Sequence, residues 1–199
     1  MEGNERLLVD IVLIMTALSP LWLAIGFTLR STLNFLQVLL WMPAAMFTAF
    51  LWRARLHGRI PDDIQGAVLI SNHRSSVDPF FMQMASRRPI GWMIAREYAS
   101  GPVIGRIMDI LDVIKAGRRG VDTAATKRVI REASSGRLIC MFPEGRLNST
   151  TQFMQACRPG AVMVAIRAGV PIIPCYLENI PFSNVIIQPF YTPARVALY

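Results

Sequence analysis

A histidine and an aspartate, His73 and Asp78, form the first pattern in this sequence that could do chemistry. They lie in residues 72–78, NHRSSVD, directly after the apolar run of residues 67–70. A carboxylate that accepts a hydrogen bond from imidazole Nδ1–H fixes the tautomer whose Nε2 is free to act as a general base. No serine completes a hydrolase triad, so the nucleophile would be a substrate alcohol. Taken alone, the spacing is explained better by an aspartate that caps the next helix beside an unrelated histidine.

A second polar group follows the apolar run 138–142, in the segment Phe142-Pro143-Glu144-Gly145-Arg146. Polar side chains directly after a buried strand need either a function or full solvation. Backbone N–H groups around Gly145, with Arg146 beside them, would suit an anion, and Arg158 lies just before a predicted helix start. The alternative is a tight turn in which Glu144 pairs with a neighbouring arginine for structural reasons.

Basic residues mark a third loop and the whole second part of the chain. Lys115, Arg118 and Arg119 follow the start of an apolar strand at residue 113, where a solvated basic turn is an equally good explanation. The net charge of +8 falls entirely on residues 67–199. Such a balance favours anionic lipid, a phosphorylated substrate or nucleic acid as the partner. No basic stretch is interleaved with aromatic residues, so we expect no nucleic-acid binding.

Alternating elements must position these loops. Apolar runs predict strands at residues 67–70, 92–95, 138–142 and 172–177 and another from residue 113, and the intervening patterns predict helices at residues 79–85, 103–110, 122–135 and 160–168. This order predicts an α/β fold with a largely parallel sheet flanked by helices. Ligands of such sheets bind at the carboxyl ends of the strands, so the three loops should share one edge. The tail, residues 195–199, reads as a strand cut short, so the C-terminus could be truncated.

The amino-terminal part has a different composition. Residues 7–29 are apolar apart from Asp10, and residues 33–52 carry no charge. Each run is long enough to cross a bilayer as a helix, so we expect an N-terminal membrane-embedded helical pair in residues 1–59, ahead of an α/β domain in residues 60–199. Spanning is slightly favoured over a shallow hairpin in one leaflet or a buried hairpin. The arginines after the second run favour the cytoplasmic face of the membrane for the domain: Arg53, Arg55 and Arg59.

Four blocks of this sequence resemble the glycerolipid acyltransferase family, most closely its 1-acylglycerol-3-phosphate (lysophosphatidate) acyltransferase branch. The resemblance covers about residues 60–180, and the blocks agree with the family in order and spacing. They are Asn72-His73-x4-Asp78, Lys115 to Arg118, Phe142-Pro143-Glu144-Gly145 and Val170-Pro171-Ile172-Ile173-Pro174.

The resemblance implies an enzyme of phospholipid biosynthesis that moves a fatty acyl group to a lysophospholipid hydroxyl. The donor would be a thioester, acyl-CoA or acyl carrier protein, used as a substrate without a separate cofactor or metal, and membrane lipids would be partners. His73 would be the general base and Asp78 would orient it. Arg118 would hold the acceptor phosphate, and Glu144 and Gly145 would shape the acceptor site.

Two departures from the family pattern affect the remaining cations. The family usually has Thr-Arg after Glu-Gly, whereas here Arg146 follows directly and Leu147 takes the usual arginine place. Arg158 stands roughly where the family has a lysine. We expect Arg146, Arg158 and Lys115 to join the substrate-binding group.

Other functions remain open on these residues. The acceptor could be another lysophospholipid such as lysophosphatidylethanolamine, or the chain could be an inactive, membrane-anchored lipid-binding protein. A phosphate-ester hydrolase is less favoured, because no metal-ligand cluster accompanies His73. The odd number of cysteines, without CxxC spacing, argues against a disulfide framework and a zinc site: Cys140, Cys157 and Cys175.

Overall fold

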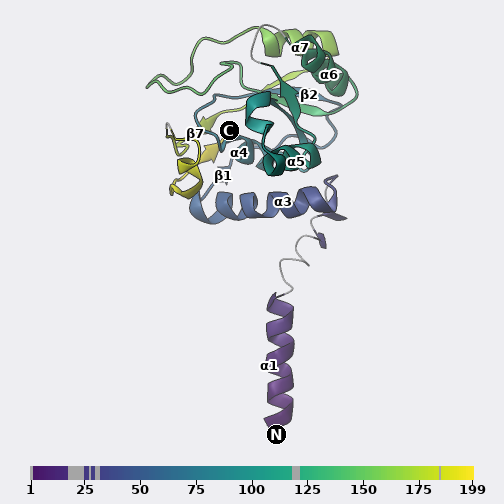
Figure 1. Ribbon diagram of the computed structural model, residues 1–199, viewed down its shortest axis with the longest axis vertical. Coiled ribbons are helices and arrows are strands. Elements are labelled where there is room, and N and C mark those ends of the chain that lie inside the picture. Colours follow the sequence, from purple (N-terminus) through teal and green to yellow (C-terminus); the bar gives the residue numbers. More distant parts are fainter. Residues whose placement is uncertain (1, 18–24, 27, 30–31, 118–121, 184) are drawn as a thin grey trace.

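The computed structural model describes residues 2–17, 25–26, 28–29, 32–117, 122–183 and 185–199. Its centre is a five-stranded parallel sheet with the order β4-β3-β5-β2-β6. This confirms the predicted α/β class with a parallel sheet (Figure 1). The strands are β2 (Ala67–Ile70), β3 (Ile90–Ala95), β4 (Ile114–Ala116), β5 (Leu138–Met141) and β6 (Ile172–Pro174).

Two buried apolar clusters cover the two faces of this sheet. Neighbouring residues of one strand, such as Val68 and Leu69, belong to different clusters because successive strand side chains point to opposite faces. Val68 packs with buried residues of two of the helices, α6 and α7, and Leu69 packs with those of a third, α4. The helices of the domain are α4 (Asp78–Met84), α5 (Pro102–Ile110), α6 (Thr123–Ser134) and α7 (Gly160–Ala168), with a 3₁₀ turn η2 (Arg96–Ala99).

Local signals set the ends of these helices. The Asp122 side chain caps α6 by accepting a hydrogen bond from the backbone N–H of Ala125 at 3.0 Å. Gly169 ends α7 with φ +68°, a left-handed conformation that glycine adopts without steric cost. Asp78 departs from its predicted capping role, since it lies inside α4 and Val77 is the cap residue.

The predicted strand 172–177 is wrong in its extent, because the chain changes sheets there. β6 ends at Pro174, and β7 (Leu177–Glu178) belongs to a second sheet of order β1-β8-β7, with β1 (Arg55–Leu56) and β8 (Ala197–Leu198). Cys175 N–H donates to the Ile70 carbonyl at 2.8 Å, and Leu177 then pairs antiparallel with Leu198. The second sheet therefore joins the chain tail to the residues that follow the amino-terminal segment.

The described residues of the amino-terminal segment do not show the expected pair of long spanning helices. Its described helices are α1 (Glu2–Ala17) and α3 (Phe35–Met46), which continues as a π-helix η1 (Phe47–Leu51). Within the described residues, no helix has both the length and the apolarity needed to cross a membrane. A capping box between Asn34 and Gln37 starts α3 at Phe35, near the beginning of the second apolar run.

Helix α3 lies along the α/β domain, below α5 in the view of Figure 1. Its Gln37 Nε2 donates to the carbonyl of Ile110, the last residue of α5, at 3.1 Å, and its Val38 is fully buried. Part of the second apolar run is therefore used to pack against the domain.

Candidate active site

His73 and Asp78 lie together at the carboxyl end of β2. His73 Nδ1 is 2.9 Å from Asp78 Oδ2, the hydrogen bond that the sequence pattern predicted. The same oxygen accepts hydrogen bonds from the backbone N–H groups of Arg74 at 2.7 Å and Ser75 at 3.0 Å. Three donors thus converge on one carboxylate oxygen, and the loop between β2 and α4 is folded around it.

Burial controls the protonation of Asp78. The side chain is completely buried, and this raises its pKa above the ordinary value of a carboxyl group, although the hydrogen bonds from His73, Ser75 and Arg74 act in the opposite direction. Its Oδ1 is also buried and has no hydrogen-bond partner among the described residues. The carboxylate is therefore held in a dry site whose donors all face Oδ2, which fixes the direction of its bond to His73.

The imidazole ring of His73 is held by stacking, and one of its two nitrogens, Nε2, has no hydrogen-bond partner among the described residues. The ring stacks on Phe142, with ring centroids 3.9 Å apart and an interplanar angle of 7°. Phe142 in turn stacks with Trp92. The His73 side chain is 20% exposed, and in the described part of the chain no group hydrogen-bonds Nε2. An oriented imidazole with an accessible Nε2 has the geometry of a general base.

Glu144 ties the two loops together through main-chain groups. Its buried carboxylate accepts a hydrogen bond from His73 N–H at 2.7 Å through Oε1 and from Gln155 N–H at 2.9 Å through Oε2. The His73 carbonyl accepts from Asn148 N–H at 2.7 Å. The alternative pairing with arginine does not appear among the described residues. Glu144 instead fixes the backbone of the candidate base.

Two buried asparagines, Asn72 and Asn148, complete this framework, and no role was predicted for the side chain of either one. The Asn72 side chain donates to Leu177 O and accepts from Leu177 N–H, both at 2.9 Å. Asn148 Oδ1 accepts from Thr150 N–H at 3.0 Å and Gln155 Nε2 at 3.2 Å. The position of Asn72 next to His73 is a sequence signal that could have identified it as part of the site. Nothing in the residues around Asn148 gives such a signal.

Arg146 and Arg158 lie beside this loop and are both exposed. Gly145 has φ +68°, and an added Cβ would lie 3.2 Å from Arg158 Cδ, so glycine permits the arginine side chain to pass over it. Arg146 Nε donates to Gln155 Oε1 at 2.9 Å. No carboxylate pairs with either guanidinium group in the part of the chain that is described. Both cations are thus free to meet an anion.

The predicted anion nest at Gly145 is not free in the structure. The Gly145 N–H donates to the Phe142 carbonyl at 3.0 Å and closes the turn. Positive charge near this loop therefore comes from the side chains of Arg146 and Arg158 and not from that amide.

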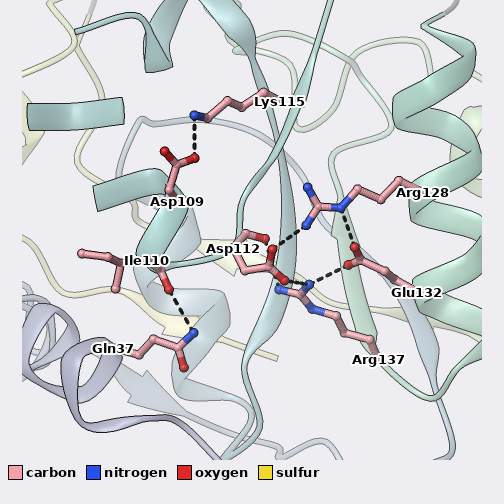
Figure 2. Close-up of polar contacts among 8 residues, drawn as sticks. All are labelled: Gln37, Asp109, Ile110, Asp112, Lys115, Arg128, Glu132 and Arg137. Atoms are coloured by element: carbon pink, nitrogen blue, oxygen red, sulfur yellow. Dashed lines mark hydrogen bonds and ion pairs between the residues drawn. The ribbon is translucent and has the colours of Figure 1, made fainter. Parts of the chain in front are cut away.

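Lys115 is not brought to His73. It lies on the edge strand β4, which β3 and β5 separate from β2. Its Nζ pairs with Asp109 Oδ1 of α5 at 2.7 Å, as Figure 2 shows. Arg118 and Arg119, the other cations predicted for this loop, lie outside the described residues.

Two of the three cysteines, Cys140 and Cys175, are poorly suited to carry an acyl group. Burial raises the pKa of the Cys175 thiol to about 11 and raises that of Cys140 well above its ordinary value. A thiol in this state is a weak nucleophile at neutral pH, because the reactive form is the thiolate. Within the described residues, no three His, Cys, Asp or Glu side chains group as they would around a metal ion.

A His–Asp pair with a buried carboxylate lies at the carboxyl edge of a parallel sheet, beside arginines that have no carboxylate partner among the described residues. These features define the class of the chain: an α/β protein with a candidate base next to exposed cations. The sequence model of the Acyltransferase family matches residues 53–178. The match covers more than half of the chain, which therefore belongs to this family.

Named proteins similar to this chain include two curated relatives and one solved structure. The 1-acyl-sn-glycerol-3-phosphate acyltransferases of Limnanthes alba and Limnanthes douglasii are each 29% identical over 132 residues, which cover 60% of this chain and 46% of theirs. The chain thus spans about half the length of these relatives. The crystal structure of the 1-acyl-sn-glycerophosphate (LPA) acyltransferase PlsC from Thermotoga maritima aligns with a TM-score of 0.63 at 17% identity, covering all of this chain and 85% of that one. At this identity the likeness shows the fold.

Proposed function

We propose that this protein transfers a fatty acyl group from a thioester donor, acyl-CoA or acyl carrier protein, to the free hydroxyl of 1-acylglycerol-3-phosphate, which gives phosphatidic acid. The observation that carries the proposal is the His73–Asp78 hydrogen bond of 2.9 Å, which leaves His73 Nε2 open at the carboxyl edge of the sheet. The printed activity of the two plant relatives supports the choice of reaction.

The reaction needs one proton carrier and no covalent enzyme intermediate. His73 Nε2 takes the proton of the acceptor hydroxyl as its oxygen attacks the thioester carbonyl. The new C–O bond replaces the C–S bond, and His73 returns the proton to the departing sulfur. Asp78 stabilises the imidazolium through Nδ1–H, and the dry setting of its carboxylate strengthens that interaction. Because a thioester is already activated, positioning and a base supply most of what the step requires.

The acceptor phosphate would be bound by arginines. Arg146 and Arg158 present guanidinium groups without carboxylate partners among the described residues, and a guanidinium fork suits phosphate oxygens. Arg118, beyond the described residues, remains a proposed third contact from its place in the sequence. Lys115 is the weakest member of the proposed group, because its ammonium is already paired with Asp109.

Both substrates are amphiphiles, so we place the protein at a membrane with its catalytic domain on the cytoplasmic face. Helix α3 presents exposed Leu36 and Leu39, and η1 presents exposed Phe50, while α1 exposes most of its apolar side chains. Apolar side chains left in water at this density are typical of a surface that meets lipid. The arginines after residue 52 support the orientation.

An acyl-transfer assay with the purified full chain tests the proposal. One labelled acyl-CoA and one labelled acyl carrier protein would be offered with lysophosphatidate, lysophosphatidylethanolamine and phosphate-free monoacylglycerol. We expect turnover with lysophosphatidate and at least a tenfold lower kcat/KM without the phosphate monoester. Preference for lysophosphatidylethanolamine would favour the alternative acceptor, which Leu147 in the usual arginine place makes worth including. Binding without any turnover would leave an inactive lipid-binding protein.

Arg158→Ala tests the phosphate contact separately. It should raise the KM for lysophosphatidate more than the KM for the donor, since only the acceptor carries the bound phosphate. Arg167→Ala, in the last turn of α7, is the matched control. An equal rise in both KM values would remove Arg158 from the acceptor site.

A further inference from the structure

The chain tail carries an exposed apolar stretch that neither the fold nor the proposed chemistry explains. In the tail segment, defined here as residues 185–191, four apolar side chains are 52% to 64% exposed: Val185, Ile186, Ile187 and Tyr191. The segment includes the 3₁₀ turn η3 (Gln188–Tyr191), in which Pro189 is buried and anchors the turn. The remaining side chains are therefore displayed on a fixed backbone.

One end of the tail segment touches the catalytic loop, defined here as residues 71–77 between β2 and α4. Ser76, between His73 and Asp78, donates its hydroxyl hydrogen bond to the carbonyl of Ile186 at 2.6 Å. Just ahead of the segment, the Arg74 guanidinium lies 5.3 Å above the ring of Phe182. The exposed apolar side chains thus begin beside the candidate base.

The other end of the tail segment is fastened to the end of the α3–η1 helix. Trp52 Nε1 donates to Pro189 O at 3.1 Å, and the Phe190 ring packs on Phe80 with centroids 5.7 Å apart. Phe80 also stacks on Trp52. In Figure 1 the yellow tail lies beside the end of α3, the side of the domain away from α7. The tail segment therefore bridges the amino-terminal helix and the catalytic loop.

Apolar exposure and positive charge continue across this bridge. Met46, Phe47 and Phe50 are exposed at the end of α3 and in η1. Arg55 lies on β1, and Arg53 and Arg195 lie just ahead of the paired strands β1 and β8. All three are exposed and without an acidic partner in the described chain. Apolar side chains bordered by unpaired arginines complement a lipid surface with anionic headgroups, to which each nearby cation is attracted.

We infer that the tail segment contacts a phospholipid bilayer that carries anionic lipid, and extends the lipid-facing surface of α3 and η1 up to His73. An acceptor lysophospholipid then moves from the bilayer to the base with its acyl chain kept out of water. The contact with lipid stands on the exposed residues themselves. The delivery of acceptor rests on the proposed function.

A fluorescent probe tests the contact without any activity. In the full chain with Cys157→Ser and Cys175→Ser, an environment-sensitive dye would be attached at Ile187→Cys or, as matched control, at Ile166→Cys of α7. Ile166 is equally apolar and 75% exposed, but it belongs to α7, which lies across the α/β domain from α3 (Figure 1). We expect vesicles of mixed phosphatidylcholine and phosphatidylglycerol to shift the emission of the dye at 187 to the blue, and to leave the dye at 166 unchanged.

The outcomes separate the possible occupants. No shift at 187 overturns the inference, and an equal shift at both positions shows indiscriminate adsorption and overturns it too. A blue shift without vesicles that grows with protein concentration assigns the surface to a second copy of the chain and also overturns it. None of these readings depends on acyl transfer, so a failure of the proposed function stays distinguishable.

A kinetic comparison tests delivery. Val185→Glu/Ile187→Glu should lower kcat/KM at least tenfold for acceptor embedded in vesicles, and less than twofold for a short-chain acceptor dispersed as monomers. Val162→Glu/Ile166→Glu on α7 should change neither. Equal losses on both forms of acceptor would indicate a damaged site and contradict the inference, as would unchanged use of the embedded acceptor.

Discussion

Two groups of charged side chains lie at opposite ends of the strands and use their charge differently. At the carboxyl ends, Asp78 and Glu144 are buried, and backbone N–H groups supply four of the hydrogen bonds to them. At the amino ends, side chains pair with one another (Figure 2): Asp112, Arg128, Glu132 and Arg137.

The second group is a network that is exposed at Asp112 and only partly exposed at Arg137 and Glu132. Arg137, ahead of β5, bonds both Asp112 at 2.5 Å and Glu132 at 2.6 Å, and Arg128 bonds the same two carboxylates. Asp112 is 53% exposed, so solvent screens its pairs and each contributes little. A buried carboxylate that accepts hydrogen bonds from the main chain is out of reach of solvent, so water cannot take the place of those hydrogen bonds. The edge that carries His73 is therefore held by backbone contacts, whereas at Asp112 the opposite edge is held by ion pairs that solvent can replace.

The largest expected effect comes from His73→Ala. Loss of the general base should lower kcat by about 10³-fold, with the fold and vesicle binding unchanged. His57→Ala is the matched control, because His57 stacks on Tyr199 with centroids 4.4 Å apart, away from the catalytic loop. Steady-state acyl transfer and a far-UV circular dichroism spectrum measure both. Turnover retained by His73→Ala would remove the base assignment.

Asp78→Asn should come next, with a loss of about 10²-fold in kcat, because the neutral amide no longer stabilises the imidazolium. The near-isosteric amide can still accept from Arg74 and Ser75, so folding should survive. Asp109→Asn, at an exposed acid, is the control. Unchanged kcat in Asp78→Asn would show that the carboxylate charge is not used.

The same variant should alter how stability depends on pH. Burial raises the pKa of Asp78, so the folded protein holds this proton more tightly than the unfolded chain does. The tightly held Asp78 proton stabilises the folded protein. This stabilisation is fully present below the ordinary carboxyl pKa and is lost as the pH rises through the raised pKa of Asp78. Urea unfolding across this range should show wild type losing free energy of unfolding relative to Asp78→Asn. The opposite trend would mean that the hydrogen bonds outweigh burial.

Glu144→Gln should destabilise the protein by about 1–3 kcal/mol, since one amide NH₂ must then face a backbone N–H of His73 or Gln155. Displacement of the His73 backbone should lower kcat as well. Urea unfolding and acyl transfer measure the two effects, and Glu178→Gln, outside this framework, is the control. A variant as stable as wild type would contradict the locking role.

Asp112→Asn should have the smallest effect, below about 1 kcal/mol. Asparagine tolerates the positive φ of 52° at this position, so the change removes the ion pairs and little else. The difference from wild type should shrink further in 1 M salt, where exposed pairs are screened. A loss of several kcal/mol that persists in salt would place the network among the essential contacts and remove the contrast between the two edges.

Sequence patterns located the elements that depend on local chemistry. The apolar runs gave the strands β2 and β5, the capping residue Asp122 and the terminal Gly169 gave the bounds of α6 and α7, and the alternation gave a parallel sheet. His73 and Asp78 could be paired because they lie only five positions apart in the chain. These features depend on residues that are close together in the chain, and such local patterns can be read directly from the sequence.

The structure alone decided what distant segments do to one another. The strand order placed Lys115 at the sheet edge, far from the base it was expected to join. Contacts between residues more than 70 positions apart gave Glu144 its role beneath His73 and put Ile186 against Ser76. Part of the second apolar run became helix α3, which packs on the α/β domain and bonds it through Gln37. Such contacts depend on which surfaces are buried against each other. The hydrophobic pattern of a sequence predicts which residues are buried, but it does not predict which other residues they contact.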